Sequence, residues 1–120
     1  MKPTINYSDF EKLDLRVGKI MKVEEIEGAD KLYKITINAG KELGERTICA
    51  GIKSHYSKKD LLKKKIVFVA NLAPRMLRGV ESQGMILAAG DEKEVFVISP
   101  EKDIEEGINR VIQWTEKNCK

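Results

Sequence analysis

The chain has 120 residues and a mass of 13.6 kDa, which is the size of one domain. Hydrophobic residues make up 42% of it and charged residues 34%, a composition typical of soluble globular proteins that excludes a disordered chain. Neither a signal peptide nor an apolar run of the ~20 residues that span a membrane is recognisable, so we expect a cytoplasmic protein.

The cysteines and the single histidine give no framework for a disulfide or a metal. Cys49 lies in an apolar run and Cys119 is next to the last residue, so we expect no structural disulfide. His55 is the only histidine, and no CxxC or HExxH motif occurs. We therefore expect neither a metal site nor a cofactor.

The first third of the chain predicts a short helix and a strand. Ser8 and Glu11 have the spacing of a capping box and predict a helical turn through about Leu13. Residues 15–24 are rich in branched side chains and predict a strand, in which Gly18 permits a bulge or a sharp bend.

Apolar and polar residues alternate from Tyr33 to Asn38, a period-two pattern that predicts a half-buried strand. Residues 40–44 are expected to form a turn, and residues 46–52 to form the hairpin partner of this strand.

The second half of the chain predicts one helix and more strands. Ser57 and Asp60 indicate a short capped helix through Leu61 and Leu62. Strands are expected at residues 66–72, 85–89 and 95–98, and no internal repeat is visible. The pattern predicts an all-β domain of five or six strands, with one helix before the fourth.

The carboxy-terminal tail has two readings. Ile108, Val111 and Ile112 follow helical spacing, whereas every second residue from Ile108 to Trp114 alternates as a strand would. Branched residues favour the strand. Trp114, the only tryptophan, either caps the barrel or lies in a dimer interface.

Charge is unevenly distributed along the chain, although the net charge is only +3. Residues 53–78 hold eight basic residues and one acidic residue, a net charge of +7. Residues 91–120 hold eight acidic and five basic residues, a net charge of −3. The basic segment predicts a face that attracts polyanions, although a solvated lysine cluster would give the same pattern.

The segment 71–89 is the most informative part of the sequence. Pro74 and Gly79 favour a bent, non-helical path, and Arg75 and Arg78 place two planar guanidinium groups on that path. Guanidinium groups match the geometry of phosphates. The alternative is that both arginines are merely solvated.

Three residues follow that offer other contacts. Ser82 and Gln83 donate and accept hydrogen bonds, and Met85 presents a polarizable surface to a base or a sugar. These residues would equally suit the end of a turn and the start of a core strand.

Four separated blocks of this sequence resemble one family, the tRNA-binding domain that occurs free-standing and appended to aminoacyl-tRNA synthetases. The blocks are DLRVGKI at residues 14–20, ADKLY at residues 29–33, Gly51-Ile52, and NLAPRMLRGVESQGMILAA at residues 71–89. The resemblance extends from Phe10 to about Gly107. Relatives in this family include the carboxy-terminal domain of bacterial methionyl-tRNA synthetase and the endothelial monocyte-activating polypeptide.

The resemblance implies an OB-fold, a five-stranded Greek-key barrel with a short helix between strands 3 and 4. Residues 1–120 would form one domain, in which residues 100–120 are a carboxy-terminal extension involved in dimerisation. The implied function is structure-specific, largely sequence-independent tRNA binding. The implied partners are tRNA, a second copy of the chain and the catalytic chain of methionyl-tRNA synthetase.

The resemblance also implies which residues meet the RNA. Basic residues would neutralise phosphates and set the register, whereas the others would meet bases or ribose. The expected RNA-binding residues are Lys31, Lys53, Asn71, Arg75, Arg78, Ser82 and Met85.

This sequence departs from the family pattern at three places. Residues 26–28 read Ile-Glu-Gly where relatives carry histidine and proline, so a histidine contact does not carry over. Met76 replaces a common lysine, whereas Lys58 and Lys59 stand where acidic residues are frequent. The basic surface is therefore expected to be displaced.

Two other classes of function compete with tRNA binding. Gly18-Lys19 and Gly40-Lys41 lack the spacing of a phosphate loop, and His55 has no nucleophile in a recognisable motif, so we expect no intrinsic catalysis. The alternative is a CsaA-like export chaperone that binds extended polypeptide. Residues 82–89 follow the tRNA-binding pattern more closely than the chaperone pattern.

Overall fold

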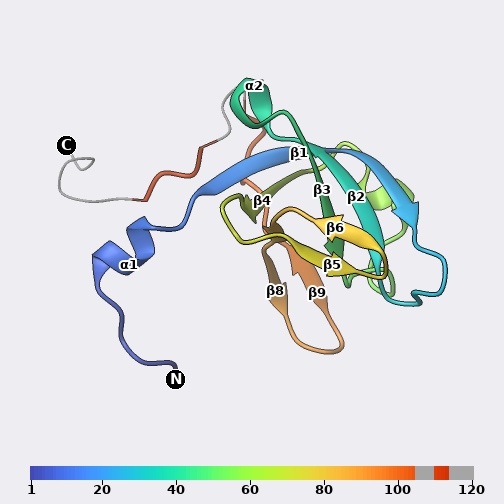
Figure 1. Cartoon of the computed structure of the whole chain (residues 1–120), viewed down its shortest axis with the longest axis horizontal. Helices are drawn as coiled ribbons and strands as arrows, with labels where there is room; N and C mark the ends of the chain where they lie inside the picture. The colour runs from blue at the N-terminus through green and yellow to red at the C-terminus, as the bar shows by residue number, and fades with distance from the viewer. Residues whose placement is uncertain (105–109, 114–120) are drawn as a thin grey trace.

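The computed structural model describes residues 1–104 and 110–113. Its helices are α1 (Tyr7–Glu11), α2 (Gly40–Leu43) and α3 (Lys58–Leu61). Its strands are β1 (Leu15–Glu25), β2 (Tyr33–Asn38), β3 (Glu45–Ala50), β4 (Lys65–Val69), β5 (Arg75–Leu77), β6 (Val80–Ser82), β7 (Met85–Ile86), β8 (Ala88–Gly90) and β9 (Val95–Val97) (Figure 1).

Five antiparallel strands in the order β3-β2-β1-β4-β7 form a nearly closed barrel. The long strand β1 takes part twice, because residues 15–19 pair with β4 and residues 19–25 pair with β2. This double pairing bends the sheet back on itself, as small barrels require. The expected all-β, OB-like barrel is confirmed.

The bend in β1 lies three residues beyond the position that the sequence indicated. The register between β1 and β2 shifts between Ile20 and Lys22, so the bulge is there rather than at Gly18. Gly18 serves packing instead, since a Cβ atom on it would lie 3.1 Å from Ile37 Cδ1 and from Phe68 Cε1. The glycine lets these two core side chains approach β1.

The core fills the barrel and is closed at one end by α3. The largest fully buried side chains are Phe68, Ile20, Ile35, Ile37, Ile48, Leu61 and Ile66. As predicted, Ser57 caps α3, since its Oγ accepts a hydrogen bond of 3.2 Å from Asp60 N. The helix lies between β3 and β4 and buries Leu61 completely. The predicted position of this helix is confirmed.

Four other predictions need correction. The amino-terminal helix is capped by Asn6 rather than by Ser8, and the Asp9 carboxylate accepts a hydrogen bond from Asn6 N. Residues 40–43 form the helical turn α2. Strands β5 and β6 form a hairpin that the turn-rich sequence concealed, and the strand expected at residues 85–89 is divided into β7 and β8.

Part of the tail lies beside β1. Arg110 forms an isolated antiparallel bridge with Arg16, and Val111 N donates a hydrogen bond of 3.0 Å to Leu15 O. This one bridge is a strand-like contact, but residues 111–113 form no strand, and Ile108, Trp114 and Cys119 lie outside the described residues. Within the described ranges, no helix is long and apolar enough to span a membrane.

A buried arginine holds the beginning of β1. Arg16 is only 5% exposed, and its guanidinium donates to both carboxylate oxygens of Asp14, at 2.6 and 3.1 Å, and to Glu42 on α2, at 3.1 Å. Bidentate pairs of this kind are strong and geometrically specific. The hydrogen bond from Arg16 lowers the pKa of Asp14, and the two carboxylates raise the pKa of Arg16.

We predict that Asp14→Asn lowers the free energy of unfolding by about 1–2 kcal/mol at pH 7, because a charged acceptor of a buried guanidinium is lost. Since the folded-state pKa of Asp14 is depressed below 3.8, the carboxylate stabilises the fold above that pH and loses this effect as the pH falls through the folded-state pKa. Urea unfolding at pH 7, 5 and 3 measures the difference, which should shrink at pH 3. An equal difference at pH 3 and pH 7 would contradict the ion-pair explanation, and Glu27→Gln on an exposed loop is the control.

Candidate nucleic-acid interface

The hairpin of β5 and β6 carries the arginines that the sequence indicated. Arg78 and Gly79 form its two-residue turn with φ values of 51° and 81°, the pattern of a type I′ turn. The register pairs Arg75 with Ser82 and Leu77 with Val80 on one face. The hairpin lies against β3 in Figure 1. The predicted bent, non-helical path is confirmed, and it ends in a strained arginine at the tip.

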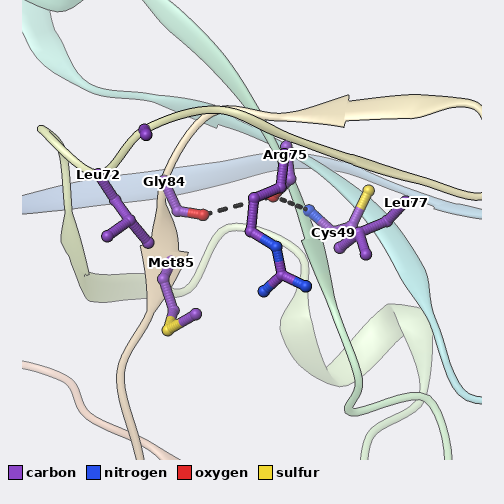
Figure 2. Close-up of a pocket in the computed structure, with 8 residues that line it drawn as sticks. Cys49, Leu72, Arg75, Leu77, Gly84 and Met85 are labelled. Carbon is purple, nitrogen blue, oxygen red and sulfur yellow. Dashed lines mark hydrogen bonds between the residues drawn. The ribbon is translucent and has the colours of Figure 1, made fainter.

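A pocket lies between this hairpin and the edges of β3 and β7. It is lined by Cys49, Leu72, Ala73, Arg75, Leu77, Ser82, Gly84 and Met85. Figure 2 shows the Arg75 side chain extending over the pocket, with Met85 on one side and Leu77 and Cys49 on the other. The pocket therefore offers mostly apolar walls and one guanidinium.

The polar groups inside the pocket bond to one another. Ser82 is 5% exposed, and its Oγ accepts a hydrogen bond of 3.0 Å from Cys49 N and donates one of 3.3 Å to Gly84 O (Figure 2). Burial raises the pKa of the Cys49 thiol, which keeps this thiol protonated at neutral pH. Arg75 is therefore the charged group that the pocket presents to a ligand.

Arg75 and Arg78 are two of the cations of the basic segment, residues 53–78, that have no carboxylate partner in the described ranges. Both side chains are exposed, and neither makes an ion pair or a side-chain hydrogen bond within the described part of the chain. Their positive charges are thus available to an external anion.

Several lysines of the same segment are already paired. Lys53 and Lys58 contact the two carboxylate oxygens of Glu25, at 2.8 and 3.3 Å, and Lys65 contacts Asp103 at 2.7 Å. The Glu25 carboxylate raises the pKa of Lys53, and the two lysines lower the pKa of Glu25. The net charge of the segment therefore overstates the charge that is free to meet a ligand.

Asn71 ties the end of β4 to the beginning of β1. Its Oδ1 accepts a hydrogen bond of 2.8 Å from Asp14 N, and its Nδ2 donates one of 2.7 Å to Lys12 O. Asn71 and Ser82 thus use their polar groups within the protein. Both side chains therefore help to position the segment around them, and the base or ribose contacts that we predict for them would use the lone pair that each side-chain oxygen still has, or the second amide proton of Asn71.

Asn71 follows β4 and Arg78 lies at the hairpin tip, and the other five expected site residues fall into two groups. Arg75, Ser82 and Met85 meet at the pocket, and Met85 is 45% exposed. Lys31 is exposed in the loop between β1 and β2, and its carbonyl accepts a hydrogen bond of 3.2 Å from Lys53 N. In the described ranges, no hydrogen bond or ion pair links these two lysines to the pocket residues.

Comparison with known proteins identifies the family. Residues 15–109 match the family described as "Putative tRNA binding domain". The chain belongs to this tRNA-binding domain family.

Relatives and structural neighbours of this tRNA-binding domain agree with that assignment. The chain is 50% identical over 103 residues to the methionine–tRNA ligases of Pyrococcus horikoshii and Methanococcus aeolicus, a match that covers 86% of the chain and 14% and 15% of those proteins. It thus spans about one seventh of the length of these relatives. The fold matches that of a MetRS-related protein from P. horikoshii, with a TM-score of 0.80 and 34% identity over 90% of this chain and 98% of the other. It also matches the CsaA chaperone of Picrophilus torridus, with a TM-score of 0.80 and 33% identity over 90% of this chain and 100% of the other.

Sequence reasoning missed some residues of this tRNA-binding domain's pocket. Leu72 and Leu77 provide apolar walls, and their position in a turn-rich segment was a usable signal. Cys49 comes from β3, more than twenty residues away, and no local pattern connects it to the pocket. In the described ranges, no group of three or more potential metal ligands occurs.

We predict that Ser82→Ala lowers the free energy of unfolding by about 1–2 kcal/mol, because Cys49 N would lose its acceptor inside the protein. Thermal or urea unfolding measures this loss, with Ser54→Ala at an exposed position as the control. Unchanged stability would mean that the Ser82 hydroxyl is free to bind a ligand.

Proposed function

We propose that this chain binds tRNA by its shape and its phosphate backbone, and that it acts as an accessory tRNA-binding module of methionyl-tRNA synthetase. The observation that carries the proposal is the β5–β6 hairpin of a tRNA-binding domain, on which two exposed arginines have no acceptor in the described part of the protein. Guanidinium groups at such positions suit the phosphates of a folded RNA.

The pocket residues support recognition of shape and backbone more than base reading. The chain has three phenylalanines, three tyrosines and one tryptophan. None of the pocket residues is aromatic, so the pocket offers no aromatic platform on which successive bases would stack. Arg75 would bind a phosphate while Met85 and Leu72 support the adjacent sugar or base.

The proposed role involves no chemistry within this chain. Tethered to a synthetase catalytic chain, the domain would raise the local concentration of tRNA at the active site. The similarity to methionine–tRNA ligases supports that partner, and we propose that the complex works in the cytoplasm.

We also propose that the chain forms a homodimer through its terminal segments. An exposed apolar side chain in the carboxy-terminal segment supports such an interface, since Ile112 is 60% exposed. Sedimentation across a range of protein concentrations, with and without tRNA, would detect the dimer.

A chaperone function is the second candidate. The similarity to CsaA and the apolar side chains of Leu72, Leu77 and Met85 in one pocket favour binding of an extended polypeptide. The unpaired arginines distinguish the two functions, because an apolar peptide would leave them without an anion.

We predict salt-sensitive binding of total tRNA with a dissociation constant in the micromolar range or tighter, and weaker binding of a double-stranded RNA of similar length. If about five phosphates are contacted, the logarithm of affinity should fall with the logarithm of salt concentration with a slope of about −4. Fluorescence titration across salt concentrations measures both quantities. Equal weak binding to both RNAs, together with tight binding of an unfolded polypeptide, would support the chaperone instead.

We predict that Arg78→Asn separates binding from stability. Asparagine tolerates the left-handed conformation better than arginine, so the free energy of unfolding should rise by about 0.5–1 kcal/mol. The affinity for tRNA should fall, and the salt slope should become shallower by about 1, because one phosphate contact is lost.

Lys63→Asn is the matched control for Arg78→Asn. Lys63 is also an exposed cation with a positive φ, 69°, but it follows α3 and its backbone N–H bonds to Ile20 O at 2.8 Å. The control removes the same charge and the same backbone strain away from the hairpin. Equal losses of tRNA affinity in both variants would mean that overall charge, and not the hairpin, determines binding.

A further inference from the structure

The barrel has a seam between β3 and β7, the two edge strands of the five-stranded sheet. The two strands contact one another but share no backbone ladder. The Thr47 carbonyl accepts a hydrogen bond of 2.7 Å from Gln83 N, and Thr47 N donates one of 3.0 Å to Gln83 Oε1. Two positions further along β3, Cys49 N bonds to Ser82 Oγ. The side chains of Ser82 and Gln83, together with the Gln83 backbone N–H, thus replace the missing ladder at this edge.

Arg46 lies at the same seam and reaches both ends of the segment that carries β5 and β6. Its Nη1 donates a hydrogen bond of 3.1 Å to Ala70 O and one of 3.4 Å to Gln83 O. Ala70 directly follows β4, and Gln83 directly follows β6. One half-buried guanidinium therefore joins the two ends of residues 71–82, the excursion that holds Arg75 and Arg78.

We infer that Arg46 is a positioning residue that holds the β5–β6 hairpin over the pocket, so that Arg75 and Arg78 face the tRNA. This inference rests on the proposed function for its effect on binding. The hold on the hairpin is a property of the free protein and can be tested without RNA.

The environment of Arg46 fits this role. Arg46 makes no ion pair with a carboxylate within the described part of the chain, and its hydrogen bonds go to carbonyl oxygens. The planar guanidinium carries five N–H donors in a fixed geometry, which allows one terminal nitrogen to donate to two carbonyls. A residue that served only to neutralise an acid would not bond to both ends of one loop.

The closing experiment uses Arg46→Met, which keeps much of the side-chain length but removes the donors, and Arg46→Lys, which keeps a charge and some donors. Lys93→Met is the matched control, because it likewise removes one cation and one trypsin site, in this case an exposed lysine in the turn between β8 and β9. The first readout is the rate of trypsin cleavage after Arg75 and Arg78, together with hydrogen exchange of the Thr47 and Cys49 amides, in the free protein. The second readout is tRNA affinity in the Arg46→Met and Arg75→Ala double-mutant cycle.

We expect Arg46→Met to speed cleavage at the hairpin and exchange at both amides by about tenfold, at a temperature well below its melting midpoint. The affinity for tRNA should fall by about tenfold. Arg75→Ala should then weaken binding less in the Arg46→Met protein than in the wild type. Arg46→Lys should restore part of both effects, and Lys93→Met should change neither.

Unchanged cleavage and exchange in Arg46→Met would overturn the inference. Additive effects of Arg46→Met and Arg75→Ala on affinity would also overturn it, because Arg46 would then act independently of the hairpin. Failure of the wild type to bind tRNA would refute the proposed function, while the cleavage and exchange data would still decide whether Arg46 holds the hairpin. If Arg46→Met does not fold, Arg46→Lys provides the same comparison.

Discussion

Incomplete closure of the barrel is the constraint on which the rest of the structure depends. The edge strands β3 and β7 expose backbone groups that must find partners, because unpaired buried groups are costly and open edges invite aggregation. On β3 the partners are Ser82 and Gln83 rather than a ladder with β7, and Arg46 of β3 bonds to the carbonyls of Ala70 and Gln83 beside this edge. The hydrogen bonds that complete the barrel therefore also fix the base of the β5–β6 hairpin, so the proposed binding surface is built into the closure of the fold.

Charge in this protein divides into a structural set and a free set. Arg16, Lys53 and Lys65 have carboxylate partners, and Arg46 bonds to carbonyl oxygens. In the structural set, the carboxylate-paired cations hold β1, the segment after β3 and the chain after β9. The exposed arginines of the hairpin belong to the free set, since they have no such partner in the described ranges. A modest net charge of +3 is therefore compatible with a local anion-binding surface, because the position of each cation matters more than the sum.

The sequence was sufficient for the parts of the fold that depend on local patterns. The alternation from Tyr33 to Asn38 predicted β2, and the Ser57 cap predicted α3. Both features depend only on residues that are close together in the sequence. The bulge in β1 was misplaced, since it depends on the register with β2 and not on Gly18 alone. For the site, the arginines were found because their side chains and turn residues are local. The intramolecular hydrogen bonds of Asn71, Ser82 and Arg46 could not be predicted, because these bonds go to partners more than twenty residues away in the chain.

The backbone of the hairpin tip carries a further argument for function. Arg78 adopts a positive φ of 51° at a turn position that asparagine, aspartate or glycine would occupy with less strain. Burial does not explain the choice, since the side chain is exposed and makes no side-chain hydrogen bond or ion pair within the described ranges. Backbone strain that no interaction within the fold compensates is typical of functional sites, such as those that bind a ligand. The guanidinium is exposed at the tip of the hairpin, where a phosphate can supply the missing partner. The strain at Arg78 and the hydrogen bonds of Arg46 thus fit one arrangement, in which the fold holds the hairpin rigidly and leaves its cations unsatisfied until an anionic ligand binds.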